Sequence, residues 1–297
     1  MPSPCFDRRA LLAGAGLLLT GGALWPPAGR AAADEQVLRL AFIPQESPEK
    51  LLGDIDVITE YLAAEIGVPV EGFVTLDHAA AVEALRSGTA DISFAGALPY
   101  VLAHDQVGAE VLLSEVYRGR SEYVARLFVR KDSGITTLAG LEDKTIAFAD
   151  PISESGYLYP LEIVAEAGLL EPGADPQSFF RRVYFAGGYQ QAIQAMANGL
   201  VDVAGVSEFA DLLLTPAQQS QVTWIAESRP IPSHAVIARQ DLDPELKEAF
   251  VRAMLKLNEP GQRHLLQHVY GPDGYVRATH AAYEPVAEVA RRYGLIG

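Results

Sequence analysis

The chain has 297 residues, of which 49% are hydrophobic and 21% are charged, and its formal net charge is −15. The hydrophobic share excludes a disordered chain, and the negative charge argues against a nucleic-acid partner, which needs a basic face against phosphate. The single cysteine, Cys5, excludes a disulfide scaffold and a zinc site built from cysteines.

Residues 1–33 are organised like an export signal. Arg8 and Arg9 form a basic start, the apolar stretch that follows is too short and glycine-rich to span a membrane, and the end at Ala33 offers an A-x-A cleavage site. The paired arginines resemble a twin-arginine signal, with an ordinary Sec signal as the alternative. Either route predicts a periplasmic protein, cleaved near Ala33 and free of cysteine.

The first part of the mature chain alternates strand and helix patterns. Residues 37–42 alternate like a strand, residues 51–66 place leucines and isoleucines on one helical stripe, and residues 68–74 form a second strand. A short helix over 79–86 and a strand over 90–95 follow. This order predicts a parallel sheet covered by helices.

A similar series of patterns follows from residue 127 onward. The predicted strands are 145–149, 182–185, 201–206 and 234–238, and the predicted helices are 156–167, 189–197, 209–214, 244–258 and 283–293. Both halves also contain the same unit of an alanine-rich helix, a glycine and a strand opened by aspartate, at residues 81–92 and 192–203. This repeat indicates two lobes of similar build.

We therefore expect an α/β fold of two lobes joined by a hinge and separated by a cleft. Residues 34–126 and 237–297 would form lobe 1, which is discontinuous, and residues 127–236 would form lobe 2. The hinge strands would lie near Leu127 and Ala238.

The strongest candidate for ligand binding is the segment 150–156, at the predicted carboxyl end of a strand and directly before a helix. The hydroxyls of Ser153 and Ser155, with the free N–H groups of the first helical turn at Gly156, would form an anion site beside Glu154. A plain helix cap is the alternative.

Other predicted strand ends add further polar groups. Paired glycines before residue 189 would let the backbone approach a ligand, and aromatic or acidic side chains stand at the neighbouring strand ends. Tight turns and helix caps are the structural alternatives for these positions. The additional candidates for ligand contact are Tyr100, Tyr189, Glu208, His234 and Gln45.

The chain contains no G-x-S-x-G, Walker or H-E-x-x-H motif. His264 and His268 have the spacing of metal ligands but no third ligand nearby, so the sequence predicts no metal and no cofactor. The prediction is a binding protein and not an enzyme. The alternative is an enzyme that uses Ser155 or Glu208 with His234.

The order and spacing of these motifs resemble the phosphate, phosphite and phosphonate-type periplasmic binding proteins of ABC transporters. The likeness spans residues 38–295 and rests on the 150–156 segment, the paired glycines before the second repeat, the P-I-P run at 230–232 and the ending at 278–286. The resemblance implies a type II periplasmic binding protein fold. It also implies an oxyanion held by Ser153, Ser155 and the Gly156 backbone, with Tyr100 closing from the other lobe.

Three positions depart from the aminophosphonate-binding pattern of that family. Glu154 stands where Ser or Thr is common and would repel an oxyanion, Tyr189 replaces a histidine, and His234 replaces an acid. We therefore expect phosphite, an alkylphosphonate or another small oxyanion, captured by a monomer through hinge closure and delivered to an ABC permease. The alternatives are a sensory protein that partners a membrane histidine kinase and a pocket rebuilt for a non-phosphorus ligand.

Overall fold

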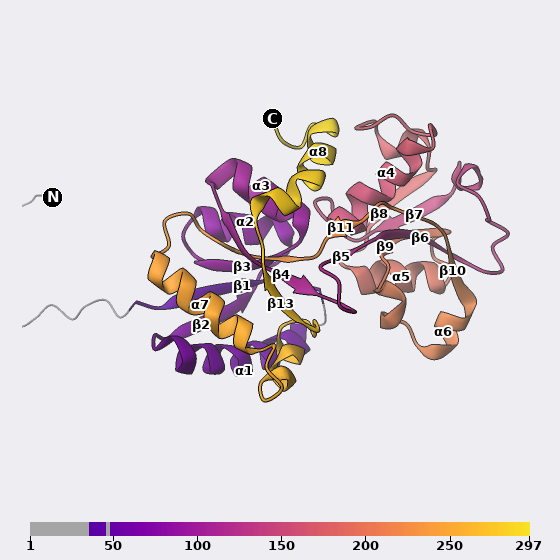
Figure 1. The fold of residues 1–297 in the computed structure, drawn as a ribbon. Helices are drawn as coiled ribbons and strands as arrows, with labels where there is room; N and C mark the ends of the chain where they lie inside the picture. The colour runs from indigo at the N-terminus through magenta and orange to yellow at the C-terminus, as the bar shows by residue number, and fades with distance from the viewer. Residues whose placement is uncertain (1–35, 46–47) are drawn as a thin grey trace, which may run out of the picture. The chain divides into compact units, whose positions relative to one another are not determined.

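The computed structural model describes residues 36–45 and 48–297 (Figure 1). The export signal expected over residues 1–33 lies outside the described residues. Within the described ranges, no helix combines the length and apolar character needed to cross a membrane.

A six-stranded sheet has the order β13-β4-β12-β3-β1-β2. β1 pairs in parallel with β2 and β3, whereas β12 and β13 run antiparallel to their neighbours. The strands are β1 Leu38–Phe42, β2 Val70–Val74, β3 Ile92–Ala95, β4 Glu110–Val116, β12 Ala235–Ala238 and β13 Gly274–Arg277.

Helices cover both faces of this sheet, as Figure 1 shows. One face packs against α1 Pro48–Ile66 and α7 Pro244–Lys256, with Ile58, Leu62 and Phe250 fully buried. The other face packs against α2 His78–Arg86, α3 Ala97–Val107 and α8 Glu284–Arg292. Because both faces are covered, the short central strand β3 is buried along its whole length.

A five-stranded sheet has the order β10-β6-β9-β7-β8. Its central strands β6, β7 and β9 carry mostly buried apolar residues, which form a core on each face of the sheet. The strands are β6 Ala125–Arg130, β7 Thr145–Phe148, β8 Arg182–Phe185, β9 Val203–Ser207 and β10 Val222–Glu227, and the helices are α4 Tyr159–Glu166, α5 Tyr189–Ala197 and α6 Pro216–Gln221.

The chain passes between the two sheets twice within the described residues. The first passage follows β4 and contains β5 Glu122–Tyr123, and the second follows β10 and contains β11 Ile231–Pro232. β5 and β11 pair with each other in a small antiparallel sheet. We call the two passages, residues 117–124 and 228–234, the crossing segments.

The remaining elements are single turns. Five of them are 3₁₀ turns, η1 Ala139–Leu141, η3 Pro176–Ser178, η4 Ala210–Leu213, η5 Arg263–His268 and η6 His280–Tyr283, and one is a π-helical turn, η2 Glu154–Leu158. The helix predicted over 209–214 is thus the 3₁₀ turn η4, and the helix predicted over 156–167 starts with η2 before α4. The sequence patterns did not predict β4, β10 and β13.

The repeated sequence unit has the same structure in both sheets. Gly88 after α2 and Gly199 after α5 both take the left-handed conformation, with φ of +72° and +76°. The aspartate that follows accepts a hydrogen bond from the backbone N–H of the neighbouring strand in each sheet, 2.8 Å from Arg39 N to Asp91 and 2.8 Å from Thr145 N to Asp202. The repeated unit therefore connects helix, turn and strand in the same way in both sheets.

Candidate functional site

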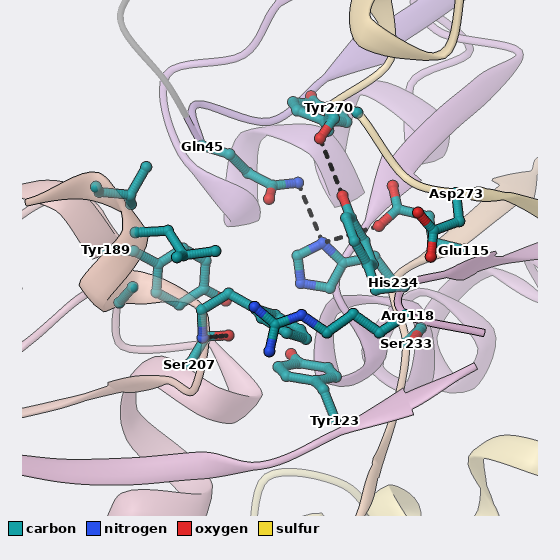
Figure 2. Close-up of a pocket in the computed structure, with 16 residues that line it drawn as sticks. Gln45, Glu115, Arg118, Tyr123, Tyr189, Ser207, Ser233, His234, Tyr270 and Asp273 are labelled. Atoms are coloured by element: carbon teal, nitrogen blue, oxygen red, sulfur yellow. Dashed lines mark hydrogen bonds and ion pairs between the residues drawn. The ribbon is translucent and has the colours of Figure 1, made fainter. Parts of the chain in front are cut away.

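A cavity of about 370 Å³ lies where the crossing segments meet the two sheets. Figure 2 shows the His234 ring beside Gln45 and Glu115, with Tyr123 and Arg118 nearby. Of the predicted site residues, Gln45, Tyr189 and His234 line this cavity. The walls thus come from the segment after β1, from β4 and from the loop before β13 on the side of the six-stranded sheet, from β9, η4 and the start of α5 on the side of the five-stranded sheet, and from the crossing segments.

The serines predicted to bind an oxyanion lie behind the cavity wall. Ser153 Oγ caps the η2 turn by accepting a hydrogen bond from Gly156 N at 3.0 Å. The Tyr189 hydroxyl lies 3.2 Å from Ser153 Oγ and 3.0 Å from Ser155 Oγ. Both serines have zero exposure, and the cavity lining includes neither of them. In this structure their hydroxyls contact protein groups, which is the helix-cap arrangement with an added tyrosine.

Gly156 is required by packing and not by an unusual backbone conformation. A Cβ at this position would lie 2.6 Å from Ala149 Cβ and 2.8 Å from Ser153 Oγ. Its N–H donates to Ser153, so this backbone group also contacts the protein itself. The structure therefore brings Ser153, Ser155, Gly156 and Tyr189 together, as the sequence analysis expected of one site, but of these four only Tyr189 lines the cavity.

The Glu154 carboxylate contacts the start of α3 and the first crossing segment. Its Oε2 accepts a hydrogen bond from Leu98 N at 3.3 Å, in the first turn of α3, and its Oε1 accepts one from the Tyr123 hydroxyl at 2.7 Å. The side chain has zero exposure. Gly96, directly before α3, makes room for it, since a Cβ there would lie 2.4 Å from Oε2.

His234 connects Glu154 with the cavity. Its Nε2 lies 3.2 Å from Glu154 Oε1, and its Nδ1 lies 3.1 Å from Gln45 Nε2 and 3.9 Å from Glu115 Oε2. Burial by itself lowers the pKa of this imidazole, but the hydrogen bond and charge of Glu154, with the charge of Glu115, raise it above its usual value. Burial likewise opposes ionisation of Glu154, yet His234 and the Tyr123 hydroxyl bring its pKa down to about 2. Each of the two side chains thus favours the ionised form of the other.

Glu115 is a cavity residue that the sequence analysis missed. It lies on β4, is 2% exposed, and reaches the cavity beside His234. Burial raises its pKa to about 7; the His234 charge acts against this shift, and the Glu154 charge adds to it. The signal that could have found it is an acidic residue inside the apolar run at 111–116, because a buried strand tolerates a carboxyl only where it has a partner or a ligand.

Aromatic rings make up much of the remaining cavity wall, and the sequence analysis did not single them out apart from Tyr189. The Phe209 ring stacks with Tyr123 at 6.3 Å between centroids and tilts against Tyr117 at 5.6 Å. The Arg118 guanidinium lies 5.3 Å from the Phe209 centroid. These residues lie in loops and crossing segments, where no helical or strand periodicity marks which side chains point inward.

Two predicted contact residues do not reach the cavity. Tyr100 is buried beneath α8, where its hydroxyl lies 2.9 Å from His280 Nδ1 and its ring packs edge-on to Tyr283. Glu208 accepts a hydrogen bond from Val124 N at 3.2 Å and forms ion pairs with Arg120 and Arg126. Its neighbour Ser207 lines the cavity instead.

The described residues contain no serine–histidine pair of the kind that the enzyme alternative needs. Ser155 Oγ has the hydroxyls of Tyr123 and Tyr189 as its partners, and His234 has Gln45, Glu154 and Glu115. A serine nucleophile needs a base within about 3 Å of its oxygen. The geometry therefore places no histidine beside Ser155 Oγ.

Comparisons with a family model and with individual proteins point to the same family. A family model described as "ABC transporter, phosphonate, periplasmic substrate-binding protein" matches residues 40–283. The phosphate-import protein PhnD of Mycolicibacterium smegmatis is 31% identical over 172 residues, which are 56% of this chain and 54% of that protein. The phosphonates-binding periplasmic protein of Escherichia coli is 30% identical over 222 residues, 72% of this chain and 64% of that protein. The matches thus span between half and two thirds of these relatives.

Solved structures share the fold. PhnD1 of Prochlorococcus marinus in complex with methylphosphonate has a TM-score of 0.77 and 18% identity, over 89% of this chain and all of that one. A binding protein component of an ABC phosphonate transporter from Pseudomonas aeruginosa has a TM-score of 0.76 and 24% identity, over 86% of each chain. The α/β architecture is therefore that of the type II periplasmic binding proteins, as the sequence analysis predicted.

Proposed function

The chain belongs to the periplasmic substrate-binding family of phosphonate ABC transporters, and on this premise we propose that it captures a small molecule in the periplasm and delivers it to a membrane permease. The observation that carries this proposal is the cavity, because its walls come from both sheets and from the crossing segments. A site built in this way can be closed around a ligand by a change at the crossing segments alone.

We propose that the two sheets belong to two lobes, residues 34–126 with 237–297 and residues 127–236, and that the paired crossing segments are the hinge. Two facts support this division: β5 and β11 are the only strand pair of the small third sheet, and each lies between strands of the two large ones. Ligand contacts made from both lobes would shift an open–closed equilibrium toward the closed state, and the closed shape would be read by the permease.

Relatives provide the first ligands to test. The names of the similar proteins mention phosphate, phosphonates and methylphosphonate, and the resemblance of the sequence adds phosphite. Purified protein should be titrated with these compounds and with small amines in a thermal-shift assay. A ligand at 100 times its dissociation constant stabilises a protein by about 2.7 kcal/mol. If no small molecule of either class stabilises the protein, the capture function is wrong.

Export is tested separately. The chain should be found in the periplasmic fraction of a Gram-negative host, and deletion of residues 1–33 should leave it in the cytoplasm. Replacing Arg8 and Arg9 by lysine should block a twin-arginine route but leave a Sec route working. Periplasmic material that still carries the first 33 residues would contradict the proposed cleavage near Ala33.

A further inference from the structure

We propose that Glu154 determines ligand specificity by filling the oxyanion site with the protein's own carboxylate, and that the cavity selects a small organic cation. This inference rests on the proposed capture function and assigns its ligand class. It starts from the position of Glu154, which is held between the turn that precedes α4 and the first turn of α3.

The groups that could bind an oxyanion here already contact protein atoms. Leu98 N–H, the Tyr123 hydroxyl and His234 Nε2 surround the two oxygens of Glu154 at 3.3, 2.7 and 3.2 Å. A free N–H at a helix start, a hydroxyl and an imidazole are the donors that an anionic ligand would need. An incoming phosphonate would have to displace a buried carboxylate or lie next to it, and either arrangement places like charges together in a poorly solvated site.

The serine hydroxyls offer no alternative binding site for an oxyanion. Tyr189 lies within hydrogen-bonding distance of both Ser153 and Ser155, and all three side chains are buried. Tyr189 lines the cavity, whereas the two serines that its hydroxyl contacts do not. The oxyanion site is thus closed on one side by Glu154 and on the other by Tyr189.

Beside Arg118 and His234, the cavity lining contains aromatic rings and carboxyl groups that can contact a cation. Tyr117, Tyr123, Phe209 and Tyr270 contribute ring surfaces, and Glu115 and Asp273 contribute carboxyl groups. Rings of this kind attract a cation over their faces, and Phe209 already has the Arg118 guanidinium 5.3 Å from its centroid. Because Arg118 is exposed at the cavity rim, a ligand cation can compete with it for the ring and gain the Glu115 carboxylate as well.

Ser233 gives an independent indication of a ligand. It lines the cavity, is 2% exposed, and its Oγ has no hydrogen-bond partner among the described residues. A buried hydroxyl without a partner costs free energy, so a polar group from outside the protein is expected to bind it. Together with Glu115, this hydroxyl would accept the N–H groups of an ammonium ligand.

The test is a set of calorimetric titrations on three proteins. Wild type, Glu154→Thr and Glu154→Gln are each titrated with methylphosphonate, inorganic phosphate, choline and phenethylammonium. Wild type should bind at least one cation and neither oxyanion, and Glu154→Thr should gain methylphosphonate affinity at least tenfold. The isosteric Glu154→Gln keeps the shape of the site, so it reports on the charge if the smaller threonine prevents folding.

A second set of variants isolates the cation contact. Glu115→Gln should weaken cation binding at least tenfold, whereas Glu162→Gln, which removes a buried carboxyl on α4 outside the cavity, should leave it unchanged. Wild-type binding of methylphosphonate as tight as that of Glu154→Thr would overturn the specificity role of Glu154. Binding of no cation by wild type, or equal cation binding by Glu115→Gln, would overturn the ligand class.

Different results would contradict the capture function and the ligand class proposed here. A protein that binds methylphosphonate tightly and no cation keeps the capture function and loses this inference. A protein that binds none of the four probes, in any of the variants, loses both.

Discussion

At the scale of single residues, the buried groups around His234 carry the chemistry of the site. Glu115, Glu154 and His234 are far apart in the sequence, but the fold brings their side chains together. The His234 ring lies 3.2 Å from a carboxyl oxygen of Glu154 and 3.9 Å from one of Glu115. His234 lies beside two carboxyl groups whose pKa values shift in opposite directions. The pKa of Glu154 is lowered, and the pKa of Glu115 is raised. The imidazole outweighs the effect of burial at the nearer carboxyl, Glu154, whereas burial outweighs the more distant imidazole at Glu115.

This imbalance predicts a pH-dependent stability for Glu115. In the unfolded chain this carboxyl ionises near pH 4.5, but in the folded protein its pKa is about 7. Between these values the folded state holds a proton that the unfolded state has released, so the free energy of unfolding falls as pH rises. Relative to wild type, we expect Glu115→Gln to gain roughly 3 kcal/mol of stability between pH 4 and pH 8.

Urea unfolding of both proteins at pH 4 and pH 8 tests this expectation. His234 also contributes, since its raised pKa adds stability at low pH that is lost as pH rises through the folded value. The difference between wild type and variant separates the two effects. A difference that does not change between pH 4 and pH 8 would show that Glu115 is not the titrating group.

Gly96 allows the Glu154 carboxylate to reach α3. Its φ is −67°, so the backbone tolerates any residue, but an added Cβ would lie 2.4 Å from Glu154 Oε2. We expect Gly96→Ala to cost about 1–3 kcal/mol of stability through this overlap. The cost should largely disappear in the Glu154→Thr background, because the two changes act on one contact. Thermal unfolding of the two single variants and the double variant measures this coupling, and additive effects would contradict it.

At the scale of elements, the repeated unit explains how each sheet fixes its neighbouring helix. α2 and α5 each end in a left-handed glycine, and each following aspartate binds the N–H of an adjacent strand. Asp202 additionally accepts a hydrogen bond from the Thr145 hydroxyl at 2.7 Å, and Asp91 accepts one from Arg239 Nε at 2.8 Å. The hydrogen bonds to charged aspartates secure the edges where helix and strand meet.

This arrangement predicts equal importance for the two aspartates. Asp202→Ala and Asp91→Ala should each lower the free energy of unfolding by about 1–3 kcal/mol, because each leaves a backbone N–H without its acceptor. Asp132→Ala is the control, since this exposed aspartate pairs only with Arg130 on the surface. Chemical denaturation measures all three. Losses no larger than that of the control would mean that the shared motif has no structural role.

At the scale of the whole molecule, the site depends on contacts between segments that are far apart in the chain. Gln45 follows β1, Glu115 lies near the end of β4, Phe209 precedes η4, and His234 follows β11. Only the two passages of the chain between the sheets bring these segments to one cavity. A ligand that touches all of them would favour the arrangement in which both sheets contribute.

We therefore expect ligand binding to make the molecule more compact. Small-angle X-ray scattering of the purified protein should show a smaller radius of gyration with a saturating ligand than without it. Because residues 34–297 contain no cysteine, a variant of this segment can carry a pair of introduced cysteines, at exposed positions outside the cavity such as Leu52 and Leu200, for distance measurements by fluorescence. A bound protein with unchanged scattering and unchanged label distances would contradict hinge closure.

The sequence by itself determined the fold class and most of the elements, because alternating and helical periodicities record which residues are buried locally. The strands at 145–148, 182–185 and 203–207 and the helices at 189–197 and 284–292 lie where their patterns predict them. The repeat and the motif order also led to the family, which the comparisons confirm. These features are encoded in neighbouring residues, so they can be read without coordinates.

Only the tertiary structure decided what the candidate residues contact. Sequence placed Ser153, Glu154 and Ser155 at a helix start, but it could not show that Tyr189 covers the serines or that Glu154 turns toward α3. It also gave no sign that Glu115 and Phe209 would meet His234, since these residues come from separate segments. A buried carboxylate takes its role from the donors around it, and those donors are assembled by long-range packing rather than by any local pattern.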